Sequence, residues 1–306
     1  MIHIENLTKH YSNFTLQLSF DLPEGKVSGL VGKNGAGKST TIKSILGLVK
    51  KDSGTLEIFG KDIAAITAAD KEDIGVALSD SGFSGYLTVE SVISILKNMY
   101  HRFDEQQFRH LCQILNLPLN KKIKEFSTGM KAKLRVITAI THNARLLIMD
   151  EPTSGLDPVM QEVFIEYIRN EKKRGKTILL SSHIFSEVDA TCDRIAIIKD
   201  GRIVSDFIAD DLRHATQKAY RLTFDTPEQM TRFLIENQNS DVMQISETDP
   251  AENTVVILTD DQYINQIIDV LSAYSVSGFE HQKETLEDYF MKYYKEDKNF
   301  GGVFQK

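Results

Sequence analysis

The sequence predicts an α/β protein, in which a domain with a mixed sheet core and a helical insert (residues 1–215) precedes a small α+β domain (residues 216–306). Two observations lead to this prediction. In the first domain, short apolar runs alternate with helical spacing, which is typical of parallel strands joined by crossover helices. Helical periodicity over about residues 82–144 interrupts that alternation. The first domain ends near residue 215, and a new series of strands and helices begins there.

Strands are expected first, because apolar and polar side chains alternate over residues 2–31, which end in the apolar run 27–31. Helical spacing follows over residues 41–49. A further short apolar run covers residues 74–78, just before the insert.

Two helices are predicted at the start of the insert. Thr88 can cap a helix over residues 89–99, and Asp104 can cap the next helix, where Gln107 three residues later resembles a capping box. Pro118 is expected to end this second helix.

Strands return as the apolar runs 146–149, 177–180 and 194–198, with a helix over residues 159–174 between the first two. This order predicts βαβ crossovers and a parallel sheet. Asp200-Gly201 is a hairpin signal that joins the last two strands of the domain.

The C-terminal domain has a different order of elements. We expect strand 220–224, helix 227–237, strands 242–246 and 254–259, helix 262–274, strand 276–281 and a closing helix 286–294. Without the closing helix, this is the βαββαβ order of a split sandwich. The closing helix carries Tyr289, Phe290, Tyr293 and Tyr294, which we interpret as a packing face.

Composition limits the class of partner. Hydrophobic residues make up 41% and charged residues 26%, and the net charge of -7 argues against nucleic acid as the main partner. Cys112 and Cys192 have no metal-ligand spacing, as expected of buried thiols in a reducing compartment. The N-terminus has no signal-peptide pattern, and no apolar run approaches the roughly 18 residues that span a bilayer. If the protein acts on a membrane, we expect another chain to cross it.

A phosphate-binding motif, G-x-x-x-x-G-K-[ST], lies between the strand ending at residue 31 and the next helix. Its residues are Gly32, Lys33, Asn34, Gly35, Ala36, Gly37, Lys38 and Ser39, and Thr40 follows. Glycines let backbone N–H groups approach phosphates at the positive end of the helix dipole. We expect Lys38 to add charge near the β- and γ-phosphates and Ser39 to ligate Mg²⁺. The alternative is a glycine-rich turn, and the motif alone indicates only a P-loop NTPase: a GTPase, a kinase, a helicase or a transporter ATPase.

Two acidic residues follow the apolar run 146–149, at the strand end where α/β sheets bind ligands. Asp150 is predicted to hold Mg²⁺ and Glu151 to polarise the attacking water. Such a base contributes about 10²–10⁴-fold in rate. The alternative is that the two acids only begin a loop. It is less favoured because the same chain also carries the phosphate-binding motif.

The run E-F-S-T-G-M-K at residues 125–131 resembles the signature loop of ABC ATPases, usually L-S-G-G-Q, and lies between the other two motifs as in that family. The resemblance covers roughly residues 1–215 and implies a P-loop NTPase fold of the ABC type. It implies that Ser127, Thr128 and Gly129 hold the γ-phosphate of an ATP bound by the opposite subunit. Ser127 also fits an ordinary helix N-cap, which uses the same geometry.

Three further features resemble the family. Residues 154–157 are similar to the D-loop that crosses the dimer interface, and His183 is similar to the switch histidine that contacts the γ-phosphate. Tyr11 matches the aromatic residue that stacks on adenine. Without the resemblance, a lone histidine such as His183 is more often structural, and Tyr11 is open to interpretation as a packed strand tyrosine.

Two departures from the family pattern stand out. The signature lacks one glycine and the glutamine, as in bacterial exporters that resemble the bacitracin-resistance type. Ser79 occupies the place of the Q-loop glutamine, which in the family touches Mg²⁺ and relays the nucleotide state to the membrane partner. Asp80 lies beside it, and its substitution for the glutamine is left open. By resemblance, Phe83 and Tyr86 are candidate contacts with that partner.

The resemblance implies the ATP-binding and ATP-hydrolysing subunit of an ABC transporter, with Lys38, Glu151 and His183 as catalytic residues and ATP and Mg²⁺ as cofactors. It further implies export of antimicrobial or amphipathic peptides through a membrane-spanning permease on another chain, at the cytoplasmic face of the cell membrane. The subunit would pair as a homodimer or as a heterodimer with a related ATPase. A nucleotide-dependent regulator that does not hydrolyse ATP is the alternative. An ABC ATPase acting on ribosomes or DNA fits less well, because the chain has neither a second such domain nor a long coiled coil.

Overall fold

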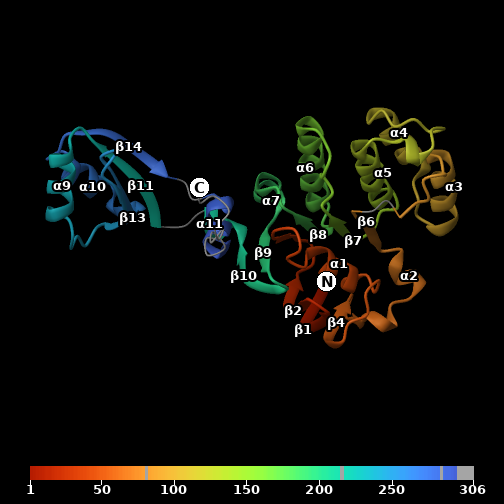
Figure 1. Ribbon diagram of the computed structural model, residues 1–306. Coiled ribbons are helices and arrows are strands. Elements are labelled where there is room, and N and C mark those ends of the chain that lie inside the picture. Colours follow the sequence, from red (N-terminus) through yellow and green to blue (C-terminus); the bar gives the residue numbers. More distant parts are fainter. Residues whose placement is uncertain (80–81, 214–216, 283–284, 295–306) are drawn as a thin grey trace, which may run out of the picture. The chain divides into compact units, whose positions relative to one another are not determined.

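The computed structural model describes residues 1–79, 82–213, 217–282 and 285–294 (Figure 1). It divides into two compact units, Met1–Ala209 and Asp210–Lys306. The boundary expected between residues 215 and 216 falls in the segment 214–216, which lies outside the described residues, as does Asp80.

A six-stranded sheet forms the centre of the first unit, in the order β10-β9-β3-β8-β7-β6. The strands are β10 Arg202–Ile208, β9 Arg194–Lys199, β3 Val27–Val31, β8 Thr177–Ser182, β7 Leu146–Asp150 and β6 Ile74–Ala77. All neighbours pair in parallel except β10, which runs antiparallel to β9. The predicted parallel sheet is confirmed, and so is the hairpin at Asp200–Gly201, where both residues have positive φ, 48° and 77°.

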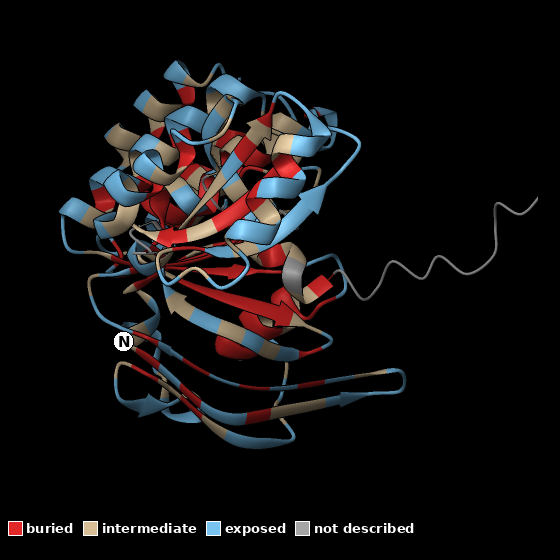
Figure 2. Ribbon diagram, turned by 90° about the vertical axis from the view of Figure 1, so that its left-hand side faces the viewer, coloured by how far each residue is buried: buried red, intermediate tan, exposed pale blue. Residues whose placement is uncertain are grey.

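An antiparallel sheet in the order β2-β1-β4-β5 shares the main hydrophobic core with this sheet. Its strands are β1 Ile2–Tyr11, β2 Phe14–Leu22, β4 Ser53–Ile58 and β5 Lys61–Asp62. Strands β3, β7 and β8 are buried along their whole length, whereas buried and exposed residues alternate along β1 and β2; Figure 2 colours the residues by burial.

The helical spacing over residues 41–49 corresponds to α1, Lys38–Ile45, which begins near Ser39 as the phosphate-binding motif predicts but ends before residue 49. Gly37, with φ 115°, is its N-cap, so the helix begins within the phosphate-binding motif. It ends earlier because Gly47 adopts a left-handed conformation, φ 69°. Lys38 is consequently the first residue of α1.

Three helices make up the insert: α3 Val89–Met99, α4 Glu105–Ile114 and α5 Thr128–Ile140. They enclose a hydrophobic cluster of their own. Thr88 caps α3 as predicted, since its hydroxyl accepts from the Ser91 N–H at 3.2 Å.

The second helix of the insert differs from its prediction at both ends. Asp104 accepts from the Gln107 N–H at 2.8 Å, but its own N–H donates to the Thr141 carbonyl at 2.7 Å, so the predicted capping box is incomplete. The helix ends at Ile114, before Asn116 with φ 54°. The prediction that Pro118 ends it is therefore wrong, because an asparagine in the left-handed conformation has already turned the chain.

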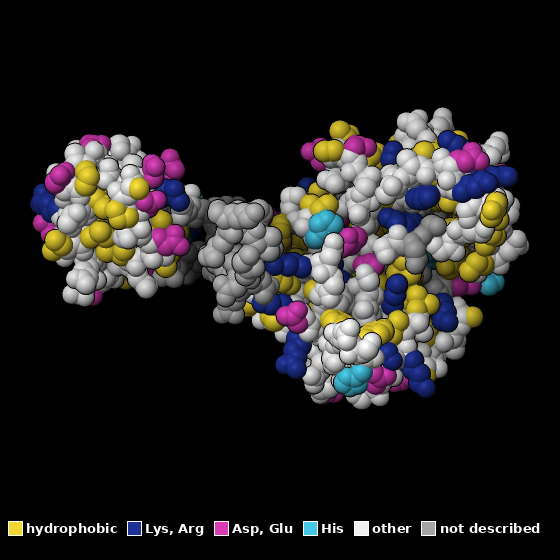
Figure 3. Space-filling model, in the orientation of Figure 1, with side chains coloured by type: hydrophobic (Ala, Val, Ile, Leu, Met, Phe, Trp, Pro, Cys, Tyr) yellow, Lys and Arg dark blue, Asp and Glu magenta, His cyan; other side chains and the backbone are white. Residues whose placement is uncertain are grey.

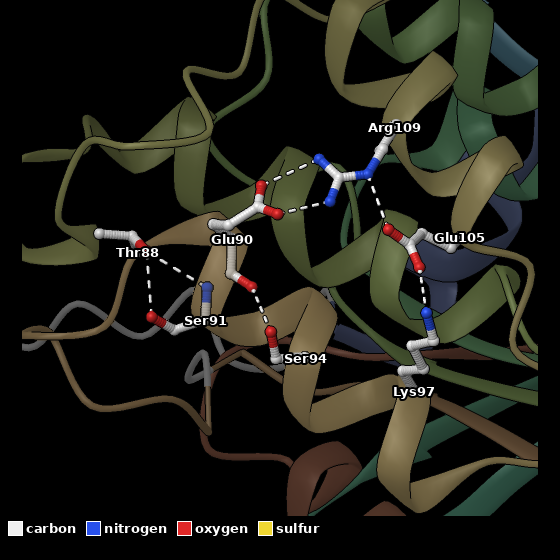
Figure 4. A network of polar contacts seen from close by, with 7 residues as sticks. All are labelled: Thr88, Glu90, Ser91, Ser94, Lys97, Glu105 and Arg109. Carbon is white, nitrogen blue, oxygen red and sulfur yellow. Dashed lines mark hydrogen bonds and ion pairs between the residues drawn. The ribbon is translucent and has the colours of Figure 1, made fainter.

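An ion-pair network joins α3 to α4 (Figure 4). Arg109 donates to both carboxylate oxygens of Glu90 and to Glu105, and Glu105 also accepts from Lys97 at 3.0 Å. The network thus links the two helices through side chains of opposite charge.

Helices cover both faces of the six-stranded sheet. Figure 1 shows α5 and α6 on one side of strands β6 to β8, and α1 with the antiparallel sheet on the other. The crossover helix α6, Pro158–Lys173, joins β7 to β8, and α7, Phe185–Thr191, joins β8 to β9. A short helix, α2 Ala68–Lys71, precedes β6.

The second unit contains a four-stranded antiparallel sheet in the order β12-β13-β11-β14. Its elements are β11 Gln217–Phe224, α9 Pro227–Glu236, β12 Gln244–Asp249, β13 Thr254–Asp260, α10 Ile264–Leu271, β14 Val276–Gln282 and the closing helix α11 Leu286–Tyr294, while α8, Ala209–Arg213, begins at the border. The predicted βαββαβ order is confirmed. Figure 3 shows hydrophobic side chains on the visible face of this unit, whose exposed apolar residues include Ile235, Ile268 and Phe279.

Among the described residues, no helix combines the length and apolarity needed to cross a membrane.

Candidate nucleotide-binding site

The phosphate-binding loop turns the chain sharply from β3 into α1. Gly35 and Gly37 have φ values of 85° and 115°, which side chains rarely adopt. A Cβ atom on Gly37 would also lie 3.0 Å from the Leu16 side chain and 3.1 Å from Phe14. The loop can therefore bring its backbone close to the N-terminus of α1 only with glycine at these positions.

Lys38 is held inside this loop and is only 4% exposed. Its ammonium donates to the carbonyl of Gly32 at 2.7 Å and to that of Lys33 at 3.3 Å. It also lies 3.2 Å from Oε1 of Glu151. Two loop carbonyls thus hold the buried Lys38 ammonium close to the carboxylate that follows β7.

Glu151 follows β7 and contacts residues of α1 and of the β8 segment. It has an unusual φ of 48°, and its N–H donates to the Ser181 carbonyl of β8 at 3.0 Å. While Oε1 faces Lys38, Oε2 lies 3.2 Å from Nδ1 of His183, the residue that follows β8. The fold brings these three predicted catalytic residues together because β7 and β8 are neighbours.

The Asp150 carboxylate is almost completely buried beside Glu151, at 1% exposure. Its Oδ1 accepts from the Ser181 hydroxyl at 2.6 Å, whereas its Oδ2 is buried without a hydrogen-bond partner. An unpaired carboxylate oxygen is costly unless a ligand completes it, and Mg²⁺ typically takes one or two carboxylates together with substrate phosphates. The residues present fit Mg²⁺, although the described residues hold no group of three or more acidic, histidine or cysteine ligands.

A pocket of about 370 Å³ opens over the loop. It is lined by Phe14, Asn34, Gly35, Gly37, Lys38, Ser39, Thr40, Ser79 and Glu151. Gly32, Lys33 and Ala36 support the loop through their backbone, since Ala36 donates to the Lys33 carbonyl at 3.1 Å. The volume and the polar lining suit the phosphates of a nucleotide.

The aromatic side chain that lines this pocket is Phe14, which the sequence did not single out. Tyr11 is 46% exposed and is not among the lining residues; its ring centroid lies 6.3 Å from that of Phe14. Phe14 begins β2 just after the turn that follows Tyr11, so a short spacing between two aromatic residues was the available signal.

Ser127, Thr128 and Gly129 lie at the start of α5 and do not line the pocket of their own chain. The Ser127 hydroxyl accepts from the Met130 N–H at 3.2 Å, which is the N-cap geometry. A Cβ on Gly129 would lie 2.9 Å from the carbonyl of Gly155, and one on Gly155 would lie 2.8 Å from the Thr128 side chain. The signature segment therefore packs directly against the segment 154–157.

Ser79, at the place of the expected glutamine, lines the pocket, and its carbonyl accepts from Arg135 of α5. Asp80 lies outside the described residues.

A glycine-rich loop between a buried parallel strand and a helix, with a buried lysine and two strand-end acids, defines a P-loop nucleotide-binding protein. The family model described as "ABC transporter" matches residues 16–154. The chain is 30% identical over 298 residues to the bacitracin transport ATP-binding protein BcrA of Bacillus licheniformis, covering 95% of this chain and 96% of that protein. The chain belongs to the family of ABC transporter ATP-binding proteins, and it binds ATP as members of this family do.

Solved structures share this fold. The ATP-binding subunit of an ABC transporter is 28% identical and superimposes with a TM-score of 0.63, covering 70% of this chain and 92% of that one. A dimeric ATP-binding cassette in a post-hydrolysis state, bound to ADP and Pi, is 20% identical and has a TM-score of 0.61, over 68% and 99% of the two chains.

Proposed function

We propose that this chain hydrolyses ATP to drive export through a separate membrane-spanning permease, at the cytoplasmic face of the cell membrane. One observation carries the proposal: Glu151 lies 3.2 Å from both Lys38 and His183 at the mouth of the pocket. A carboxylate, an ammonium and an imidazole in this arrangement can orient water and stabilise a transferring phosphoryl group.

The geometry supports a role for each residue of the site. The loop N–H groups and Lys38 would hold the β- and γ-phosphates, and the nucleotide would displace the Glu151 carboxylate from Lys38. Glu151 would then orient a water and accept its proton while the water oxygen bonds to the γ-phosphorus and the bond to the bridging oxygen of ADP breaks. His183 would donate to a γ-phosphate oxygen. Mg²⁺, held by Asp150 and Ser39, would neutralise charge on the phosphates.

The position of the signature segment supports a dimer. Ser127 to Gly129 lie at the start of α5, where helix N–H groups can bind phosphate, but they do not line the pocket of their own chain. We propose that this segment completes the pocket of a second copy or of a related ATPase, and that the two subunits close head to tail around two nucleotides. The dimeric cassette of the same fold supports this arrangement.

The adenine base would stack on Tyr11, whose ring is exposed at the end of β1. The cargo would be antimicrobial peptides, a proposal supported by the full-length similarity to a bacitracin transport protein. Because the permease would carry the cargo, we expect no residue of this chain to contact it. Phe83 and the exposed Tyr86 remain proposed contacts with that permease.

Phosphate release by the purified full chain tests this function. We expect Mg²⁺-dependent hydrolysis that rises more than linearly with protein concentration, and a Glu151→Gln variant with less than about a tenth of that rate. A surface variant, Glu166→Gln, is the matched control and should keep the rate. Hydrolysis by Glu151→Gln above that level would remove Glu151 from its role.

A second function, a nucleotide-dependent regulator without hydrolysis, is favoured by Ser79, which lines the pocket where the family has glutamine. Absence of phosphate release by the wild-type chain, both alone and with its permease in membranes, would support the regulator.

A further inference from the structure

Glu187, near the start of α7, is a buried carboxylate for which the proposed reaction has no use. Its side chain is 1% exposed, and Oε1 is buried without a hydrogen-bond partner. Oε2 accepts two hydrogen bonds, from the Thr153 hydroxyl at 2.8 Å and from the Ser182 hydroxyl at 2.7 Å. Burial raises the pKa of Glu187. Burying a carboxyl group with one oxygen unpaired costs folding free energy, so the contacts of the other oxygen indicate its role.

The two hydroxyls come from the two segments that carry the catalytic side chains. Thr153 lies two residues after Glu151, and Ser182 directly precedes His183. The Ser182 hydroxyl also accepts from the Ile184 N–H at 3.0 Å, so it ties the backbone on both sides of His183. One oxygen of Glu187 therefore joins the segment after Glu151 to the segment before His183.

The same contact reaches the signature segment. Thr153 leads into Gly155, whose close packing against Thr128 and Gly129 leaves no room for a Cβ atom. Side chains and backbone thus form a continuous series of contacts from the His183 segment, through Glu187 and Thr153, to the start of α5.

We propose that Glu187 is a positioning residue: it holds His183 and the segment 153–155 in one arrangement and so links the pocket of its chain to the signature segment that the same chain offers to the other pocket. This inference rests on the proposed function. A movement of His183 upon binding or loss of phosphate would be passed through the hydrogen bonds of Ser182 and Thr153 to Glu187, and through the packing of Gly155, to the signature segment.

The test compares variants that differ in their ability to accept these hydrogen bonds. Glu187→Met removes the acceptor at similar size, while Glu187→Gln keeps a carbonyl oxygen that can accept both hydroxyls. In the full-length chain we expect Glu187→Met to lower kcat at saturating ATP by about tenfold or more, with KM within about threefold. Its Hill coefficient for ATP should fall toward one. Glu187→Gln should keep at least about a third of the wild-type kcat.

Thr153→Val removes one of the two donors without changing shape, and it keeps the test sharp should Glu187→Met fold poorly. We expect Thr153→Val to lower kcat and the Hill coefficient as well. The losses in the double variant Thr153→Val/Glu187→Met should be less than multiplicative, because both changes break one link. Glu166→Gln on the exposed face of α6 serves as the control.

Wild-type kcat and Hill coefficient in both Glu187→Met and Thr153→Val would overturn the proposal. So would a loss of kcat that matches only the loss of folded protein, measured by circular dichroism at the assay temperature. Both outcomes require an active wild-type chain, so they differ from a failure of the proposed function, in which the wild-type chain releases no phosphate.

Discussion

Glu151 and Lys38 form an ion pair across the mouth of the pocket, with Oε1 and Nζ 3.2 Å apart. The pair occupies the position where the loop and the helix N-terminus would receive phosphate, and Lys38 is 4% exposed there. Under the proposed function, a nucleotide would compete with a carboxylate of the protein for the same ammonium. Hydrolysis and nucleotide affinity would then be coupled through this contact.

Nucleotide affinity should respond in opposite directions to changes in the two partners. Glu151→Gln removes the competing charge, so we expect the Kd for ATP to fall roughly two- to fivefold, the size of a partly exposed ion pair. Lys38→Met should raise the Kd by about 10–100-fold, since hydrogen bonds to charged groups contribute about 1.5–3 kcal/mol. Calorimetric titration measures both, with Lys50→Met as the exposed lysine control. Weaker ATP binding by Glu151→Gln would contradict the competition.

The adenine platform can be assigned by comparing Tyr11 with Phe14. Stacking on an aromatic ring contributes about 1–3 kcal/mol per base, so Tyr11→Ala should weaken ATP binding on the order of tenfold, while Tyr11→Phe should leave it unchanged. Phe14→Ala should mainly lower Tm, because Phe14 packs against the main core. Titration with ATP and with inorganic triphosphate separates base from phosphate contacts. If Phe14→Ala weakened the binding of ATP more than that of inorganic triphosphate, and Tyr11→Ala did not, Phe14 would be the residue on which adenine stacks.

The Arg109 network should make the insert's stability depend on pH. Hydrogen bonds from Arg109 lower the pKa of Glu90 below its usual 4.5, and those from Lys97 and Arg109 do the same for Glu105. Lowered carboxyl pKa values stabilise the fold above the unfolded value and lose that effect as pH falls through the folded value. Arg109→Met should therefore lower Tm at neutral pH, and this difference should shrink as the pH falls through the folded pKa values of the two carboxyl groups. A pH-independent loss, compared with the exposed control Lys121→Met, would point to packing instead.

Glu187 should have the opposite pH dependence. Burial raises its pKa above the usual 4.5, with hydrogen bonds from Ser182 and Thr153 and the nearby His183 acting the other way and Glu151 adding to the rise. Its contribution to stability is present below the unfolded pKa and is lost as pH rises through the folded one. The Tm of Glu187→Gln minus that of the wild type should therefore increase between about pH 4 and pH 8. A constant or decreasing difference would mean that the carboxyl group is not penalised by burial.

Local signals were sufficient for most elements and for the motifs. Alternating and continuous apolar runs predicted the strands, and Asp200-Gly201 predicted its hairpin, because glycine and the hydrophobic period act over a few residues. The end of α4 was missed because Asn116, rather than Pro118, turns the chain, and the Asp104 N–H was drawn from its capping box by the distant Thr141 carbonyl. The first miss has a local cause, the left-handed conformation of one asparagine, whereas the second depends on a hydrogen bond to a residue far along the chain.

The sequence by itself determined the chemical groups of the site: a glycine-rich loop with Lys38, and Asp150 with Glu151 at the end of an apolar strand. Within each of these two motifs the residues are neighbours along the chain, and local backbone geometry is enough to present them. Only the tertiary structure decided that His183 reaches Glu151, that Ser181 and Phe14 belong to the site, and that Glu187 joins Thr153 to Ser182. Those contacts depend on β3, β8 and β7 lying side by side, an order that comes from packing helices on both faces of the sheet and that no local pattern specifies.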